Sequence, residues 1–139
     1  MNVYVLDTDT LSLFQRGHPI VTKRCAAKSP GELVITVSSV EEQHSGRLRF
    51  IRKVRKPDEL PRVYQSPIET VRSLSKLPII SFSPAAFARY SQLIGLKLDV
   101  GRMDLRIAAT VVDLGGILVT RNVRDFSRIP GLILEDWSI

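Results

Sequence analysis

The stretch that decides the fold is VYVLDTDTLSLF, residues 3–14. Its apolar run at 3–6 has the length of a buried strand, and Asp7 follows that run directly. The residues LSLF at 11–14 then resume an apolar pattern at the spacing of a short helix. The stretch therefore predicts a first strand with acidic residues at its carboxyl end.

Four more apolar runs of strand length follow, at 33–37, 77–82, 116–120 and 132–135. Amphipathic helical patterns lie at 19–28, 39–56, 60–77, 84–96 and 103–114. Short, nearly uncharged strands separated by helices are typical of a parallel sheet covered on both faces. The sequence predicts one three-layer α/β/α domain over residues 1–139, with a central, mainly parallel sheet.

The composition limits the kinds of site that the chain can hold. A hydrophobic fraction of 44% in 139 residues is enough for one core. The chain contains no apolar run near the roughly 18 residues that cross a membrane and no signal-peptide pattern, so a cytoplasmic protein is expected. Cys25 is the single cysteine and His18 and His44 are the only histidines, which argues against a disulfide and a zinc site. A metal would have to be held by oxygen.

The net charge is +6, and much of the positive charge lies in RLRFIRKVRK at 47–56. Such a cluster can bind phosphate backbones. It can equally be the solvated face of a helix, because Leu48, Ile51 and Val54 keep an apolar stripe at helical spacing. The role of this basic run stays open at this stage.

Asp7 and Asp9 occupy different positions relative to the first strand. In open α/β sheets, sites form beyond the carboxyl ends of the strands, so Asp7 is predicted to face a ligand. Asp9 or Thr10 would cap a helix that begins at LSLF, and we favour a capping role for Asp9. Asp7 is not required as a cap under this prediction.

Further acids are expected at the same edge. Glu41 and Glu42 follow the second strand, in the first turn of a helix that Ser38 or Ser39 would cap. Asp104 stands near the start of a helix, and Asn122 and Asp125 come just after the strand at 116–120. Four carboxylates are thus predicted to converge, those of Asp7, Glu42, Asp104 and Asp125.

Carboxylates that share a site raise one another's pKa unless a cation is present. Mg²⁺ prefers oxygen ligands and binds through one or two carboxylates while keeping several waters. A bound metal ion can activate water and stabilise charge on a phosphate. The chemistry predicted is phosphodiester hydrolysis with Mg²⁺, for which Mn²⁺ could substitute.

The segments LDTDTLS, SSVEEQHSG, GRMDLRIAAT and LVTRNVRDFSRIPGLILEDW together resemble the PIN-domain ribonucleases, specifically the VapC toxins of bacterial type II toxin–antitoxin systems. The resemblance covers essentially the whole chain, and the segments occur in the family order. It implies a metal-dependent endoribonuclease toxin that cuts structured RNA, often transfer RNA. It also implies inhibition by a VapB-type antitoxin and a homodimer.

The resemblance assigns roles to the acids. Asp7 and Asp104 match metal ligands, whereas Glu42 and Asp125 would position or deprotonate the attacking water. Glu42 is chosen over Glu41 because the family glutamate stands four residues before a glycine. The implied products carry a 5′ phosphate and a 3′ hydroxyl. Asn122 stands where some PIN domains have an aspartate, so it would orient a water or phosphate, and the number of metal ions stays open.

Candidate RNA contacts flank these acids, because a phosphate must come within reach of the metal. They are Arg102, Arg106, Arg121 and Arg124. The segment RIPGLILEDW is similar to that of VapC toxins that cut initiator transfer RNA in the anticodon loop. Beyond it, Trp137 and Ile139 would suit either a dimer interface or closure of the core.

Two other functions are compatible with parts of the sequence. VLDTDTL also fits the D-x-D-x-T pattern of haloacid-dehalogenase-type phosphatases, in which Asp7 would be the nucleophile and Asp9 the acid. The chain is short for that fold, and VVD at 111–113 falls inside a predicted helix. Alternatively, the chain could be a non-catalytic basic RNA-binding module whose acids are helix caps.

Overall fold

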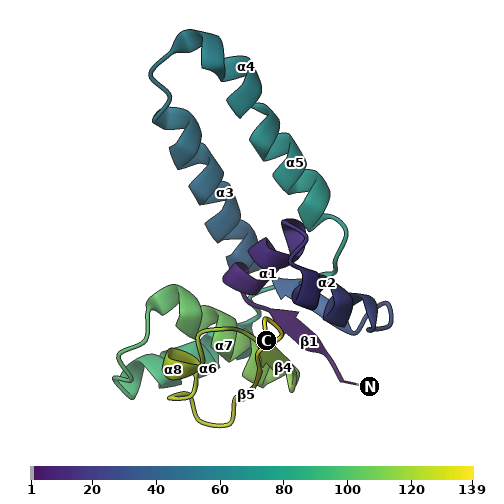
Figure 1. The fold of residues 1–139 in the computed structure, drawn as a ribbon. Coiled ribbons are helices and arrows are strands. Elements are labelled where there is room, and N and C mark those ends of the chain that lie inside the picture. Colours follow the sequence, from purple (N-terminus) through teal and green to yellow (C-terminus); the bar gives the residue numbers. More distant parts are fainter. Residues whose placement is uncertain (1) are drawn as a thin grey trace.

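The computed structural model describes residues 2–139, and its centre is a five-stranded sheet (Figure 1). The strands are β1 (Tyr4–Leu6), β2 (Leu33–Thr36), β3 (Ile79–Ile80), β4 (Ile117–Val119) and β5 (Ile133–Glu135). Their order is β3-β2-β1-β4-β5, and every neighbouring pair is parallel. All five strands lie within the predicted apolar runs, so the predicted parallel sheet is confirmed.

Helices connect the strands and cover both faces of the sheet (Figure 1). They are α1 (Thr8–Gln15), α2 (Pro19–Ala26), α3 (Val37–Arg52), α4 (Leu60–Val63), α5 (Gln65–Leu74), α6 (Pro84–Gly95), α7 (Arg102–Leu114) and α8 (Val123–Phe126), with a 3₁₀ turn, η1, at Pro57–Glu59.

Two helix predictions need correction, and proline accounts for both. The helix predicted over 60–77 is divided into α4 and α5, because Pro67 has no N–H to donate to the carbonyl of Val63. The helix predicted to reach residue 56 ends at Arg52. Lys56 is extended, with φ −98° and ψ 115°, as expected for a residue that precedes a proline.

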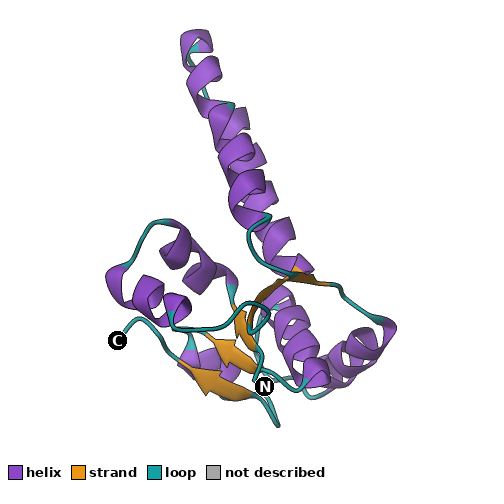
Figure 2. Ribbon diagram, turned by 90° about the vertical axis from the view of Figure 1, so that its right-hand side faces the viewer, coloured by secondary structure: helices purple, strands orange, loops and turns teal. Residues whose placement is uncertain are grey.

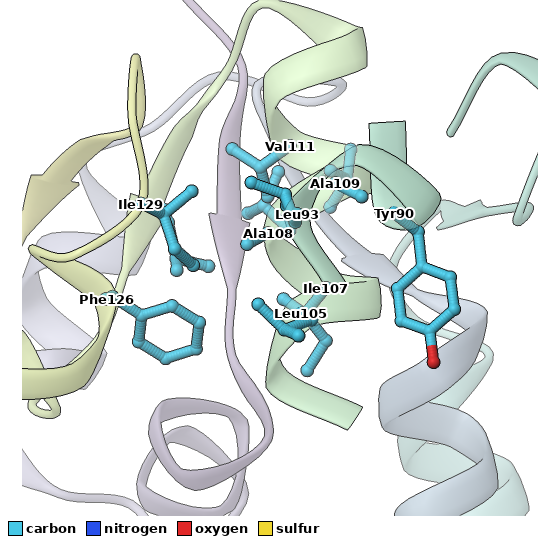
Figure 3. Packing of buried hydrophobic residues seen from close by; sticks show 12 residues of the cluster. Tyr90, Leu93, Leu105, Ile107, Ala108, Ala109, Val111, Phe126 and Ile129 are labelled. Carbon is cyan, nitrogen blue, oxygen red and sulfur yellow. The ribbon is translucent and has the colours of Figure 1, made fainter. Parts of the chain in front are cut away.

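Alternate residues of β1, β2 and β4 point into two separate cores. Val5, Val34 and Leu118 pack against α6 and α7, and Figure 3 shows the helical residues of this cluster beside Phe126 and Ile129. On the opposite face, Tyr4, Leu6, Leu33, Ile35 and Val119 pack with residues of α1 and α2. The predicted three-layer α/β/α arrangement is therefore confirmed.

Trp137 closes the second core. Its side chain is only 1% exposed, and its ring centroid lies 5.3 Å from that of Tyr4. Its Nε1 donates to Oε1 of Glu135 at 2.8 Å. Of the two roles that its sequence position allowed, Trp137 therefore serves core closure, whereas Ile139 is exposed.

A helical arm, residues 37–74, extends beyond the sheet. Helix α3 leads away from the domain, and α4 and α5 return beside it (Figures 1 and 2). Helix α3 begins directly after the carboxyl end of β2. The base of the arm therefore lies at the edge of the sheet where the acids were predicted. Between residues 2 and 139, no helix combines the length and apolar character needed to span a membrane.

Candidate active site

Asp7 lies directly after β1 and is buried, with 6% of its surface exposed. Its Oδ1 accepts from the backbone N–H of Thr10 at 2.8 Å, and its Oδ2 accepts from the hydroxyl of Thr120 at 2.5 Å. Burial raises the pKa of Asp7, while these hydrogen bonds oppose the rise. Both carboxylate oxygens are thus fixed in position.

The prediction that Asp9 or Thr10 caps the first helix is wrong. Helix α1 begins at Thr8, and Asp7 is its N-cap. Asp7 has the extended backbone that an N-cap residue adopts, with φ −72° and ψ 173°. Asp9 lies in the first turn with 49% of its side chain exposed. It accepts two hydrogen bonds from Arg121, at 2.7 and 3.1 Å.

Glu42 projects from the second turn of α3. The N-cap of this helix is Thr36, whose hydroxyl accepts from the N–H of Ser39 at 3.3 Å. The predicted cap at Ser38 or Ser39 is therefore wrong, and so is the placement of Glu41 and Glu42 in the first turn. The helix starts earlier because Thr36, the last residue of β2, can cap it.

A hydroxyl from α1 holds Glu42. The Oγ1 of Thr8 donates to Oε1 of Glu42 at 2.6 Å and lies 2.9 Å from the Oγ of Ser39. Thr8 has one hydroxyl hydrogen, so the Ser39 hydroxyl donates to Thr8 in this arrangement. Threonines are ordinary in turns and helix caps, so the sequence around Thr8 and Thr120 does not assign them these carboxylate partners.

Asp104 lies in the first turn of α7, close enough to the other acids for their charges to change its pKa. Its pKa is raised from 3.8 to about 6, first by burial and then by the charges of Glu42, Asp7 and Asp125. Three separate segments therefore bring negative charge close to one half-buried carboxylate. The structure brings together all four acids that the sequence predicted to converge.

Asp125 has the opposite electrostatic environment. The Nδ2 of Asn122 donates to its Oδ2 at 3.1 Å, and Nε of Arg124 donates to its Oδ1 at 3.1 Å. These two bonds, the Asn122 bond first, lower the pKa of Asp125. Asn122 also caps α8 through Oδ1, which accepts from the N–H of Asp125 at 3.4 Å. Its amide thus orients the fourth acid.

The four arginines predicted to contact RNA have different surroundings. Arg121 is paired with Asp9, and Arg124 with Asp125. The guanidinium of Arg106 lies 5.5 Å from the centre of the Tyr90 ring. Arg102 is exposed at the first position of α7.

Two surface hollows adjoin Glu42. One, of about 380 Å³, is lined by Thr8, Ser12, Gln43 and Arg47 among others, and the second, of about 240 Å³, by Ser45, Arg49 and Met103 with Glu42. The first residues of the basic run at 47–56 lie beside these hollows. Arg47 and Arg49 reach the hollows because α3 carries them only one to two turns beyond Glu42.

The acids are not arranged as a complete ligand set. Within residues 2–139, no three His, Cys, Asp or Glu side chains are grouped closely enough to hold a metal ion by themselves. Mg²⁺ commonly uses only one or two carboxylates together with water. The arrangement suits that mode of binding and offers no Cys or His ligand for zinc.

No family model matches the chain, but individual proteins do. It is 43% identical to Ribonuclease VapC2 of Rickettsia felis over 68 residues, 46% of this chain and 51% of that protein. It is 34% identical to the tRNA(fMet)-specific endonuclease VapC of Salmonella typhimurium over 68 residues, which are 46% and 52% of the two chains. These matches thus span about half the length of either relative. Ribonuclease VapC2 of Haemophilus influenzae matches at 27% identity over 96% of this chain and 97% of its own.

Solved structures extend the likeness over the whole fold. In the crystal structure of VapBC2 from Rickettsia felis bound to a promoter DNA fragment, the matched chain has 28% identity and a TM-score of 0.74, covering 97% of this chain and 98% of its own. The match in DNA-bound VapBC from Salmonella typhimurium has 25% identity and a TM-score of 0.78, with 99% of each chain covered. By sequence and by fold, the chain is similar to VapC ribonucleases, and the solved structures that it resembles are VapBC complexes.

Proposed function

We propose that the protein is a Mg²⁺-dependent endoribonuclease, the toxin of a toxin–antitoxin system, which hydrolyses phosphodiester bonds in structured RNA. The observation that carries this proposal is the grouping of Asp7, Glu42 and Asp125 around the half-buried Asp104, whose pKa burial and these charges raise. A site that concentrates negative charge at the edge of a parallel sheet is suited to a divalent cation and a phosphate. The ribonuclease names of the relatives support the same chemistry.

The residues fit a magnesium ion, and Asp7 and Asp104 would hold it. Both present carboxylate oxygens, and a divalent charge would relieve the repulsion that raises the pKa of Asp104. Mn²⁺ would substitute, because it accepts the same oxygen ligands. When bound, the ion would supply a water of lowered pKa and neutralise charge that develops on the phosphate.

The protein side chains would supply orientation and a proton acceptor. Asp7 is fixed by Thr10 and Thr120, so its oxygens keep one direction without rearrangement. Glu42, held by Thr8, would position the attacking water or accept its proton. Asp125, whose pKa is lowered, stays ionised and would share this task. In-line attack would leave a 5′ phosphate and a 3′ hydroxyl.

Substrate and partners follow from the relatives' names as further parts of the proposal. Transfer RNA is the substrate that we favour, because one relative is named a tRNA(fMet)-specific endonuclease. A VapB-type antitoxin would inhibit the enzyme, as the VapBC composition of the solved complexes supports. We also propose a homodimer that acts in the cytoplasm, where its RNA substrate and antitoxin would be found.

The test is cleavage of a transfer RNA pool by the purified protein in Mg²⁺ and in EDTA. Asp7→Asn and Asp104→Asn should abolish cleavage, whereas the matched control Asp9→Asn, which alters an exposed pair with Arg121, should retain most of it. p-Nitrophenyl phosphate serves as a parallel substrate. Phosphate release that requires Asp9 and ignores Asp104 would favour a phosphatase instead. RNA binding without cleavage in either condition would favour a non-catalytic RNA-binding module.

A further inference from the structure

A third, larger hollow lies beside the candidate active site, between α1, α3 and α5. It has a volume of about 500 Å³, and we call it the basic groove. Four cationic side chains line it, those of Arg16, Arg47, Arg72 and Lys76, against the single carboxylate of Glu69. The remaining lining side chains that the structure describes in residues 2–139 are four hydroxyls and one amide.

The basic groove connects to the hollow beside Glu42. Ser12 and Arg47 line both spaces, and Thr8 and Glu42 line the hollow on the active-site side. The Nε of Arg47 donates to the hydroxyl of Thr70 at 3.3 Å, which holds the guanidinium between α3 and α5. A chain that passes Arg47 can therefore extend from the acids into the basic groove.

The chemistry of the lining selects the ligand. Four cations against one anion attract a polyanion, and arginine, lysine and hydroxyl groups are common partners of phosphate oxygens in nucleic-acid complexes. An amphipathic protein helix would instead need an apolar groove for its apolar face. Arg16, Arg47, Arg72 and Lys76 are all exposed, so a backbone phosphate can reach them from solvent.

We propose that the basic groove binds the phosphate backbone of the RNA on one side of the cleaved bond, with Arg47 at the junction to the active site. This inference rests on the proposed function and adds a substrate-binding surface to it. It assigns a role to one end of the basic run at 47–56, which the sequence left open. It also moves RNA contact toward α1 and α5, away from Arg121 and Arg124, which are paired with carboxylates.

The first measurement is RNA binding without cleavage. Fluorescence anisotropy with a short, labelled single-stranded RNA in EDTA gives the affinity at salt concentrations from about 50 to 200 mM. Arg72→Gln/Lys76→Gln removes two exposed cations of the groove. It should weaken binding by about tenfold at the lower salt concentration and reduce the slope of log affinity against log salt by about 1.4, or 0.7 for each lost phosphate contact.

The matched control is Arg55→Gln/Lys56→Gln, which removes the same amount of positive charge from the basic run at 47–56, outside the basic groove. This variant should bind RNA within about twofold of the unchanged protein. Thermal unfolding checks that both variants fold. The proposal is overturned by an equal loss in the control, by an unchanged salt slope in the groove variant, or by absence of RNA binding in the unchanged protein. An unchanged salt slope in the groove variant would instead favour a protein as the ligand of the basic groove.

Cleavage assays separate this proposal from the proposed function. In Mg²⁺, the groove variant should show a raised KM for RNA and an unchanged rate with bis(p-nitrophenyl) phosphate, which is too small to reach the groove. RNA cleavage with groove-independent RNA binding would overturn the groove alone. Groove-dependent RNA binding with no cleavage by the unchanged protein would overturn the nuclease and keep the groove.

Discussion

Thr120 and Asp7 are 113 positions apart in the chain, and the hydroxyl of Thr120 donates to Oδ2 of Asp7 at 2.5 Å. The parallel pairing of β1 with β4 sets Leu6 opposite Val119, so the next residues of both strands meet at one edge. The same hydroxyl accepts from the N–H of Asn122 at 2.9 Å. One side chain therefore couples the first aspartate to the segment that holds Asp125.

Thr120→Val tests this coupling. The change removes the hydrogen bond to a buried carboxylate, which should cost about 1–3 kcal/mol of folding stability. It should also lower kcat for RNA cleavage by roughly 10- to 100-fold and move the rise of the pH–rate profile to higher pH, because a lost donor raises the pKa of Asp7 further. Thr120→Ser keeps the hydroxyl, so its stability and its kcat should stay close to those of the unchanged protein. A fully active valine variant would contradict the coupling.

Asp7 is both the N-cap of α1 and a proposed metal ligand, and two substitutions distinguish these roles. Asp7→Ala removes the cap oxygen of α1 and should destabilise the metal-free protein by about 0.5–2 kcal/mol. Asp7→Asn keeps an oxygen for the N–H of Thr10, and should unfold at the same or a higher denaturant concentration than the unchanged protein. Both variants should be inactive. Urea unfolding in EDTA gives the stabilities, and equal loss in the two variants would argue against the cap.

The raised pKa of Asp104 makes the stability of the metal-free protein depend on pH. Its pKa is about 6 in the folded protein against 3.8 ordinarily. Between these values the folded state binds more protons than the unfolded state, so stability should fall as pH rises through this window, by roughly 2–3 kcal/mol in total. Asp104→Asn should therefore be more stable than the unchanged protein near pH 7 and nearly equal to it near pH 4.

Magnesium supplies the control for that measurement. A ligand that binds only the folded state raises the melting temperature with concentration. Mg²⁺ should stabilise the unchanged protein near pH 7, and should stabilise Asp104→Asn much less. If the two proteins keep the same pH dependence in EDTA, Asp104 does not titrate as described.

Gly116 lies in the turn between α7 and β4, where it packs closely against the backbone just before β1. A Cβ at this position would lie 2.9 Å from the carbonyl oxygen of Val3, which also accepts from the N–H of Ile117 at 2.8 Å. Gly116→Ala should therefore cost about 1–3 kcal/mol, because backbone must shift. Gly46→Ala is a matched control, since its nearest contact would be the flexible end of Arg49 at 4.0 Å. Similar melting temperatures for the two variants would contradict this packing.

The strands and the meeting of the four acids were predictable, because the carboxyl ends of parallel strands share one edge. The first residue of α1, in contrast, was not predictable from the sequence. Asp7, Thr8, Asp9 and Thr10 can all cap a helix, and local sequence does not choose among them. The choice depends on where pairing with β4 ends, since the N–H of Asp7 still donates to the carbonyl of Val119 at 3.1 Å.

The hydroxyl partners of the acids were also beyond sequence reasoning. Ser and Thr are ordinary in turns, and whether one meets a carboxylate depends on elements far apart in the chain. Thr8 bonds Glu42 across 34 positions. The basic groove was hidden for the same reason, because α1, α3 and α5 each supply only part of its lining.

Thr8 offers the last prediction, because its bond to Glu42 has no backbone alternative in the structure of residues 2–139. The Ser39 hydroxyl donates to Thr8, and Thr8 donates to Glu42 at 2.6 Å. Thr8→Val leaves this partly buried carboxylate without that donor, which should lower kcat about 10-fold or more with little change in the KM for RNA. Thr8→Ser should restore the rate, because it keeps the hydroxyl. Ser39→Ala, one bond further from Glu42, should have a smaller effect. Steady-state cleavage of the same RNA by the three variants decides the matter, and a larger loss in Ser39→Ala than in Thr8→Val would show that Thr8 does not orient Glu42.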